Sequence, residues 1–209
     1  MFPEIFEPKS DEELSIGQVV ERIVRLNAGL NEFWSKADGW APVKAAGLLG
    51  KSRLDWQVSL SASLRHWLRE PADAISDGDL ILAWATLGSL VEGTLKLLLS
   101  VYHHDYQSDL DALKASNAYD HKKGQPKSPD GLQLQRLRLF VKGHGLLGLD
   151  GDELVELVQA RRNAIHAFED RPIGTGAEFQ MAVRGYLTLL RGVNNRLPYP
   201  DEIYKPREL

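Results

Sequence analysis

The chain has 209 residues, of which 43% are hydrophobic and 26% charged, and its formal net charge is −4. These values are ordinary for a globular domain and exclude a basic field that would draw the whole protein onto nucleic acid or an anionic membrane. Any polyanion must therefore be bound at a local site. The sequence has no cysteine, which excludes disulfides and thiolate metal sites. Together with an acidic N-terminus that does not resemble a secretory signal, this predicts a cytoplasmic protein.

Two helices and a short helical turn are predicted in the N-terminal third of the chain. Ser10 to Glu13 have the form of a capping box, and the apolar spacing after them indicates a helix that extends to about Lys36. Residues 42–49 are expected to form the short turn. The second helix is predicted over 54–68, because Pro71 then stops it.

The most apolar segment of the chain, residues 80–102, follows a helix start at Ser76. It is long enough to span a bilayer, but Glu92 and Lys96 lie inside it at adjacent turns of the helix. Each of these ions would be costly in hydrocarbon. We therefore expect the central buried helix of a bundle and no membrane span.

The character of the sequence changes at residues 103–129, which are rich in Asp, Lys, Ser and Gly and predict a largely mobile polar loop. Helical spacing returns in a fourth helix over 132–147, a fifth over 152–168 and a sixth that starts at a capping box, Thr175 to Glu178. We find no internal repeat, Gly-rich phosphate loop or interdomain linker. The prediction is a single all-α domain, a bundle of about six helices with the polar loop between the third and the fourth.

The fifth predicted helix carries the sequence QARRNAIHAFED, residues 159–170, in which basic residues lie among apolar ones. On a helical wheel Arg161 falls in the middle of a cluster of apolar side chains. This cluster comprises Leu154, Leu157, Val158, Ile165 and Phe168. A guanidinium there needs a carboxylate, a partner chain or a bound anion, because an unpaired buried charge is strongly destabilising.

Arg162 and His166 lie next to each other on the flank of this cluster, and Asn163 lies one turn before His166. A purely structural interpretation is also open. In it, Arg161 forms an ion pair with Glu92 of the apolar helix, and His166 caps carbonyl groups at the end of its own helix.

The residues from Arg161 to His166 resemble the signature of the HEPN domains, a family of all-α nucleotide-binding and RNA-cleaving proteins. That signature is an arginine, four to six intervening residues and a histidine on a late helix of the bundle. A polar residue, often Asn, commonly follows the family arginine, whereas here Arg162 holds that place and Asn163 comes next. Either Arg161 or Arg162 can therefore correspond to the family arginine.

The similarity extends over roughly residues 78–195 and includes the long apolar helix and the predicted fourth helix. The expected division is a HEPN-like core at 77–196, N-terminal helices at 1–76 that belong to the same domain or form an added arm, and an irregular tail at 197–209. By resemblance to HEPN proteins of bacterial conflict systems, the chain is expected to act in a toxin–antitoxin, abortive-infection or antiviral defence role.

The motif suits the cleavage of RNA without a metal or other cofactor. A histidine can take the proton from a 2′-hydroxyl or return one to the leaving group, and arginine binds phosphate oxygens while it stays charged. The expected catalytic residues are Arg161, Arg162, Asn163 and His166, supported by Glu92 and Lys96. Lys122, Lys123 and Lys127 form a small basic patch that is expected to contact the RNA backbone. Because cleavage needs two proton-transfer groups, the resemblance implies a homodimer with a composite active site.

Two other interpretations remain open. A non-catalytic HEPN module would bind RNA, a nucleotide or a partner subunit, such as an antitoxin or a nucleotidyltransferase. The polar loop also contains histidines and aspartates, but their spacing matches no metal-ligand pattern, so no metal site is predicted. These residues are His103, His104, Asp105, Asp109, Asp111 and His121.

Overall fold

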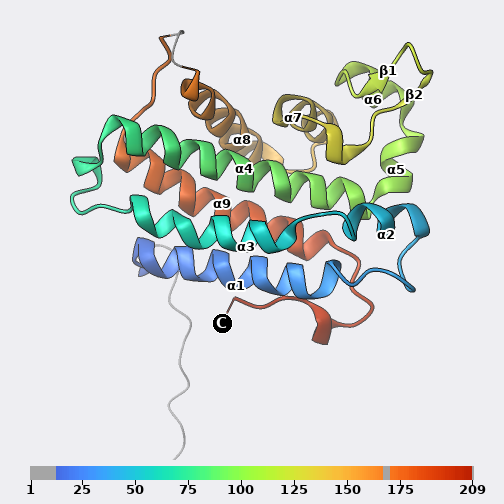
Figure 1. Ribbon diagram of the computed structural model, residues 1–209, viewed down its shortest axis with the longest axis horizontal. Coiled ribbons are helices and arrows are strands. Elements are labelled where there is room, and N and C mark those ends of the chain that lie inside the picture. The colour runs from blue at the N-terminus through green and yellow to red at the C-terminus, as the bar shows by residue number, and fades with distance from the viewer. Residues whose placement is uncertain (1–12, 167–169, 209) are drawn as a thin grey trace, which may run out of the picture.

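Helices dominate the structure, a computed structural model that describes residues 13–166 and 170–208 (Figure 1). The α-helices of these ranges are α1 Ile16–Trp34, α2 Val43–Leu49, α3 Leu54–Ser63, α4 Asp77–Val101, α5 His103–Ser108, α6 Leu110–Ala115, α7 Leu134–Gly143, α8 Gly148–Arg162 and α9 Gly176–Arg196. The all-α prediction is confirmed. The expected number of about six helices was too low, because nine α-helices occur in the described part of the chain.

Short elements connect the main helices. The 3₁₀ turns of the described residues are η2 Leu64–Trp67, η3 Ala72–Ala74, η4 Pro129–Gly131, η5 Asn163–Ile165 and η6 Glu202–Tyr204. The strands β1, Tyr119–Asp120, and β2, Gln125–Pro126, pair antiparallel with Tyr119 opposite Pro126. The predicted second helix therefore ends as an α-helix at Ser63 and continues as the turn η2.

Helix α4 is the central helix of the bundle and packs against α3, α7, α8 and α9, while α1 packs on α3 and α9 (Figure 1). Its residues Trp84, Leu87, Leu90, Val91 and Leu95 are fully buried. By length and composition α4 alone among the described helices could cross a membrane, yet 56% of its apolar window is buried within the protein. This is the packing expected of a core helix.

The starts of the long helices follow from their capping residues. Ser15 caps α1 and forms a reciprocal capping box with Gln18, so the helix starts later than predicted. Of the expected box, Ser10 to Glu12 lie outside the described residues. Ser76 caps α4 as predicted, and Thr175 caps α9 by accepting a hydrogen bond from the backbone N–H of Glu178.

The prediction of a loop at residues 103–129 was wrong. This segment folds into α5, α6 and the β1–β2 hairpin, and it buries Tyr106, Leu113 and Ala118. The hydroxyl of Tyr106 donates a hydrogen bond of 2.7 Å to the carbonyl oxygen of Lys127, which ties α5 to the end of the hairpin. The polar residues that predicted a loop lie mostly on the outside of these short elements.

The N-terminal helices and the tail share the hydrophobic core of the rest of the chain. One contiguous buried cluster includes Val19 and Leu30 of α1, Leu87 of α4 and Leu190 of α9. The tail is largely irregular, as expected, but Tyr199 holds it to the bundle by hydrogen bonds to Trp34 and Asn194.

Candidate functional site at the end of helix α8

Helix α8 ends earlier than predicted, and this changes which of its side chains are buried. The α-helix stops at Arg162, and the turn η5 leads to His166, whose backbone N–H donates to the carbonyl oxygen of Asn163 at 3.2 Å. The buried face of α8 consists of Val155 and Val158. Ile165, expected in the apolar cluster, is 49% exposed, and Phe168 lies outside the described residues.

Arg161 is held entirely by protein groups. Its Nε donates to Oε1 of Glu178 at 2.6 Å and its Nη2 to Oε2 at 3.1 Å, which makes a bidentate ion pair. Its Nη1 donates to the carbonyl oxygen of Pro172 at 2.8 Å. Glu178 was expected to complete a capping box, but its carboxylate accepts these bonds from Arg161. Arg161 therefore clamps the segment before α9 onto the end of α8.

Arg162, and not Arg161, forms the ion pair with Glu92 that the sequence raised as an alternative. The Nη1 atom of Arg162 lies 2.7 Å from Oε2 of Glu92, and Nζ of Lys96 lies 2.9 Å from Oε1 of the same carboxylate. The Arg162 stem crosses α4 at Gly88, where an added Cβ would come within 2.6 Å of Arg162 Cδ. Glycine at this position is therefore what allows α8 to approach α4 so closely.

The electrostatics of this cluster favour an ionised carboxylate. Burial raises the pKa of Glu92, but hydrogen bonds and charge from Arg162 and Lys96 outweigh that effect and hold the pKa below its usual range. The Glu92 and Arg162 side chains are 20% and 30% exposed, so the pair is only partly screened by solvent. Within the described residues, the Nε and Nη2 atoms of Arg162 have no hydrogen-bond partner and remain able to donate.

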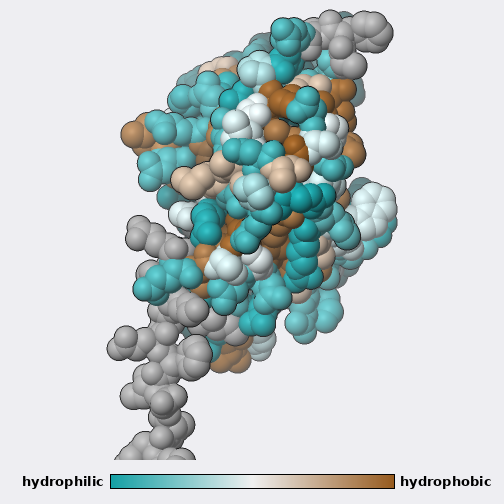
Figure 2. All heavy atoms as spheres, turned by 90° about the vertical axis from the view of Figure 1, so that its left-hand side faces the viewer, coloured by the Kyte–Doolittle hydropathy of each residue, from teal (hydrophilic) through white to brown (hydrophobic). Residues whose placement is uncertain are grey.

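His166 and Asn163 follow Arg162 in the chain, and no hydrogen bond joins their side chains to Glu92, Lys96 or Arg162. His166 is exposed, Asn163 is partly buried, and neither side chain forms a hydrogen bond to another described residue. Figure 2 looks onto the end of the molecule that carries the connection from α8 to α9, and hydrophobic side chains lie there among hydrophilic ones. The arrangement offers an exposed imidazole four residues after a guanidinium whose side chain is 30% exposed.

The predicted basic patch is far from this site. Lys122 and Lys123 are exposed in the β1–β2 hairpin, which lies at the opposite end of the molecule from the α8–α9 connection (Figure 1). The ammonium group of Lys127 donates to the carbonyl oxygen of Asn117 at 3.1 Å. The three lysines therefore do not share a surface with His166 in one copy of the chain.

No cluster of three or more His, Asp or Glu side chains that could hold a metal occurs in the described part of the chain. His103 is buried, whereas His104 is exposed and lies 3.7 Å from Asp105. Asp109 instead contacts His144, with 3.2 Å between Oδ2 and Nε2. The histidines and aspartates of residues 103–121 therefore do not gather at one point of the structure.

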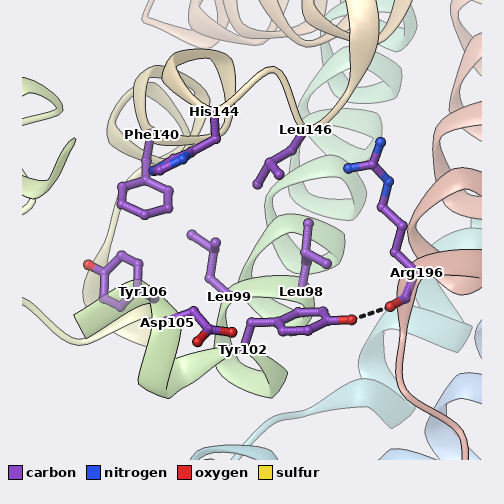
Figure 3. A pocket seen from close by; sticks show the side chains of 9 residues that line it. All are labelled: Leu98, Leu99, Tyr102, Asp105, Tyr106, Phe140, His144, Leu146 and Arg196. Atoms are coloured by element: carbon purple, nitrogen blue, oxygen red, sulfur yellow. Dashed lines mark hydrogen bonds between the residues drawn. The ribbon is translucent and has the colours of Figure 1, made fainter. Parts of the chain in front are cut away.

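Several hollows of the described surface were not predicted from the sequence. Four hollows occur on the described surface, and none of these four is lined by Arg161, Arg162, Asn163 or His166. The most apolar of them lies between α4, α5, α7 and the end of α9 (Figure 3). No sequence motif marked it, because its walls come from three segments that are far apart in the sequence, residues 98–106, residues 140–146 and Arg196.

Comparison with known proteins adds no assignment. No family model matches the chain, and no match was found among the curated proteins or the solved structures.

Proposed function

We propose that the protein is a HEPN-like, metal-independent endoribonuclease that acts as a homodimer in a toxin or antiviral defence role. The observation that supports it most is the exposed His166 at the end of α8, close in sequence to an arginine with uncommitted N–H groups. An exposed imidazole is able to reach a substrate, and a guanidinium with free donors is able to bind a phosphate. The family resemblance of the motif supplies the substrate class.

Arg162 is the better candidate for the phosphate-binding arginine. Three of the five N–H groups of Arg161 already donate to Glu178 or Pro172, and its charge is paired with Glu178, so it has fewer donors left for a phosphate than Arg162 has. Arg162 uses only one nitrogen, toward Glu92, and that carboxylate orients it. Lys96 shares the negative charge of Glu92, which leaves Arg162 less neutralised than a simple pair would.

The proposed reaction is attack of a 2′-oxygen on the adjacent phosphorus. His166 of one copy takes the 2′-hydroxyl proton as the new P–O bond forms, and Arg162 stabilises the charge on the phosphorane. His166 of a second copy gives a proton to the 5′-oxygen as its bond to phosphorus breaks. The products are a 2′,3′-cyclic phosphate and a 5′-hydroxyl, and no metal takes part.

One observation favours the second candidate, a non-catalytic HEPN-like module that binds RNA, a nucleotide or a partner subunit. Arg161 has the spacing to His166 that the family motif requires, yet each of its three guanidinium nitrogens donates a hydrogen bond that holds the fold. In this case the exposed surface around His166 contacts a ligand or an antitoxin or nucleotidyltransferase partner without chemistry.

The test is RNA cleavage by the purified protein in EDTA, with mixed cellular RNA and a tRNA pool as substrates. We expect cyclic-phosphate products from the wild type and a loss of about 100-fold or more for His166→Ala and Arg162→Ala. The matched control is His104→Ala, because His104 is also exposed but lies on α5. It should cleave like the wild type.

Two outcomes contradict the nuclease proposal. If His166→Ala cleaves as well as the wild type, the activity belongs to another site or to a contaminant. If the protein is strictly monomeric at micromolar concentration, the composite site with two histidines cannot form. Tight RNA binding without cleavage by any variant would instead support the binding module.

A further inference from the structure

The apolar hollow at the end of α4 has the size and lining of a small-molecule site. Its volume is about 410 Å³, within the range of ligand pockets in proteins. Its apolar walls come from Leu98 and Leu99 of α4, Phe140 of α7 and Leu146 of the α7–α8 connection, with the rings of Tyr102 and Tyr106 (Figure 3). A water-filled hollow with such walls gains free energy when an apolar body displaces the water.

The polar atoms of the two tyrosines are already used by the protein. Tyr106 donates its hydroxyl proton to the carbonyl oxygen of Lys127, and Tyr102 donates to the backbone carbonyl oxygen of Arg196. These bonds fix both rings as walls of the hollow. A ligand therefore meets ring surfaces there, and aromatic or aliphatic groups suit these surfaces better than polar ones.

Two charged side chains of the lining, Arg196 and Asp105, determine which charge on a ligand head group is favoured at the rim of the hollow. Arg196 is exposed, and no described residue forms an ion pair or hydrogen bond with its guanidinium. Figure 3 shows this guanidinium extending toward the side of the hollow where Leu146 lies, while Asp105 lies on the other side of the Tyr102 ring. The other basic side chain of the lining is His144, whose Nε2 lies 3.2 Å from Oδ2 of Asp109. Arg196 is therefore the free cation of this rim.

From this geometry we propose that the hollow binds an amphipathic monoanion, with its hydrocarbon or aromatic body between α4 and α7 and its carboxylate or sulfonate on Arg196. Arginine binds such groups with two parallel N–H donors. Asp105 at the opposite rim disfavours a second negative charge on the ligand. This site is separate from the proposed nuclease site, and its test does not depend on RNA cleavage.

The experiment is a fluorescence titration of the full chain with 1-anilinonaphthalene-8-sulfonate, an aromatic monoanion, followed by displacement with decanoate or 1-decanol. We expect saturable binding of one probe per chain and stronger displacement by decanoate than by the neutral alcohol. Arg196→Gln should weaken the affinity for the probe about three- to tenfold and remove the preference for decanoate, because a rim-exposed ion pair has a modest effect. The substitution leaves the backbone carbonyl of residue 196 in place, so the hydrogen bond that Tyr102 donates to it is kept.

Three further variants make the test specific. Leu146→Trp, in a connecting segment, should fill the hollow and weaken the binding of both probe and alcohol. Asp105→Asn should strengthen probe binding, and it changes a side chain that is 77% exposed, so the fold is preserved. Arg65→Gln removes an arginine of η2 that is absent from the lining and should have no effect.

The proposal is overturned if the probe shows no saturable binding to the wild type. It is also overturned if Leu146→Trp and Asp105→Asn both leave the affinity for the probe unchanged, because the probe then binds elsewhere. Equal displacement by decanoate and 1-decanol would remove the anion-binding role of Arg196.

Discussion

At the scale of single residues, the two neighbouring arginines of α8 have different roles. Arg161 closes a bidentate pair with Glu178 and a bond to Pro172, and its side chain is only 17% exposed. Arg162 makes one hydrogen bond to Glu92, and the Glu92 carboxylate also accepts a hydrogen bond from Lys96. The first residue is therefore expected to matter for folding and the second for the proposed chemistry.

The stability of two variants tests this division. Arg161→Ala leaves the partly buried Glu178 carboxylate without its two donors and should lower the free energy of unfolding by about 1–3 kcal/mol. Arg162→Ala should cost less, because Lys96 still compensates Glu92. Urea denaturation followed by circular dichroism measures both. If Arg162→Ala is the more destabilising change, the structural role belongs to Arg162 instead.

The same residues show what the sequence could and could not predict about the site. The pattern indicated that a core-side arginine needs a carboxylate, a partner chain or a bound anion, and the carboxylate of Glu178 holds Arg161. The suggested pair of Arg161 with Glu92 was wrong, because Glu92 pairs with Arg162. The sequence did not reveal Glu178 as the partner of Arg161, because the two residues are 17 positions apart and the chain between them must turn back before they can meet. The helical wheel also assumed that the helix continued past Arg162, which placed Ile165 on a buried face that ends earlier.

At the scale of the elements, the junction of α4 and α5 contains a buried histidine. His103 is only 7% exposed, and burial lowers its pKa, with Lys44 and His104 acting in the same direction and Asp130 in the opposite one. The folded state therefore favours the neutral imidazole.

This junction is also part of the segment predicted as a loop, whose short elements hold too few buried residues to show helical periodicity.

This pKa shift predicts a pH dependence of stability. Because the pKa of His103 is lower in the folded chain, the unfolded chain takes up the proton more readily, and stability falls as the pH drops below about 6.5, the ordinary pKa of histidine. The contribution is complete above that pH, and the slope from one group is at most about 1.4 kcal/mol per pH unit.

Urea denaturation between pH 5 and 8 measures this dependence in His103→Gln and in the control His121→Gln, which changes an exposed histidine that is not among the groups acting on His103. The wild type and His121→Gln should lose stability toward acid by the same amount, and His103→Gln should lose less. Equal slopes in all three proteins would show that His103 does not contribute.

At the scale of the whole molecule, a buried polar network connects the four helices α1, α3, α4 and α9. Thr94 lies 3.0 Å from the hydroxyl of Tyr186, and Gln57 donates to the carbonyl oxygen of Leu90 at 2.6 Å. Gln57 also donates to Thr94 at 3.3 Å, and Asn27 and Gln57 act on the Tyr186 hydroxyl by lowering its pKa. The hydrophobic stripes predicted most of these helices, but not this network, because its members occur once in each helix and create no pattern.

The network predicts that the N-terminal helices and the predicted HEPN-like core unfold together. Burial raises the pKa of Tyr186 despite the opposing effects of Thr94, Asn27 and Gln57, so its hydroxyl stays neutral beside these side chains. Tyr186→Phe leaves them without this hydroxyl and should cost about 1–3 kcal/mol, with one cooperative transition retained. The control Tyr204→Phe changes a ring that is 51% exposed and should cost little. Thermal unfolding followed by near- and far-ultraviolet circular dichroism measures both effects.

Two separate transitions in the wild type would show that α1 and α3 form an added arm. Coincident transitions that shift together in Tyr186→Phe would show that the four helices are one folding unit.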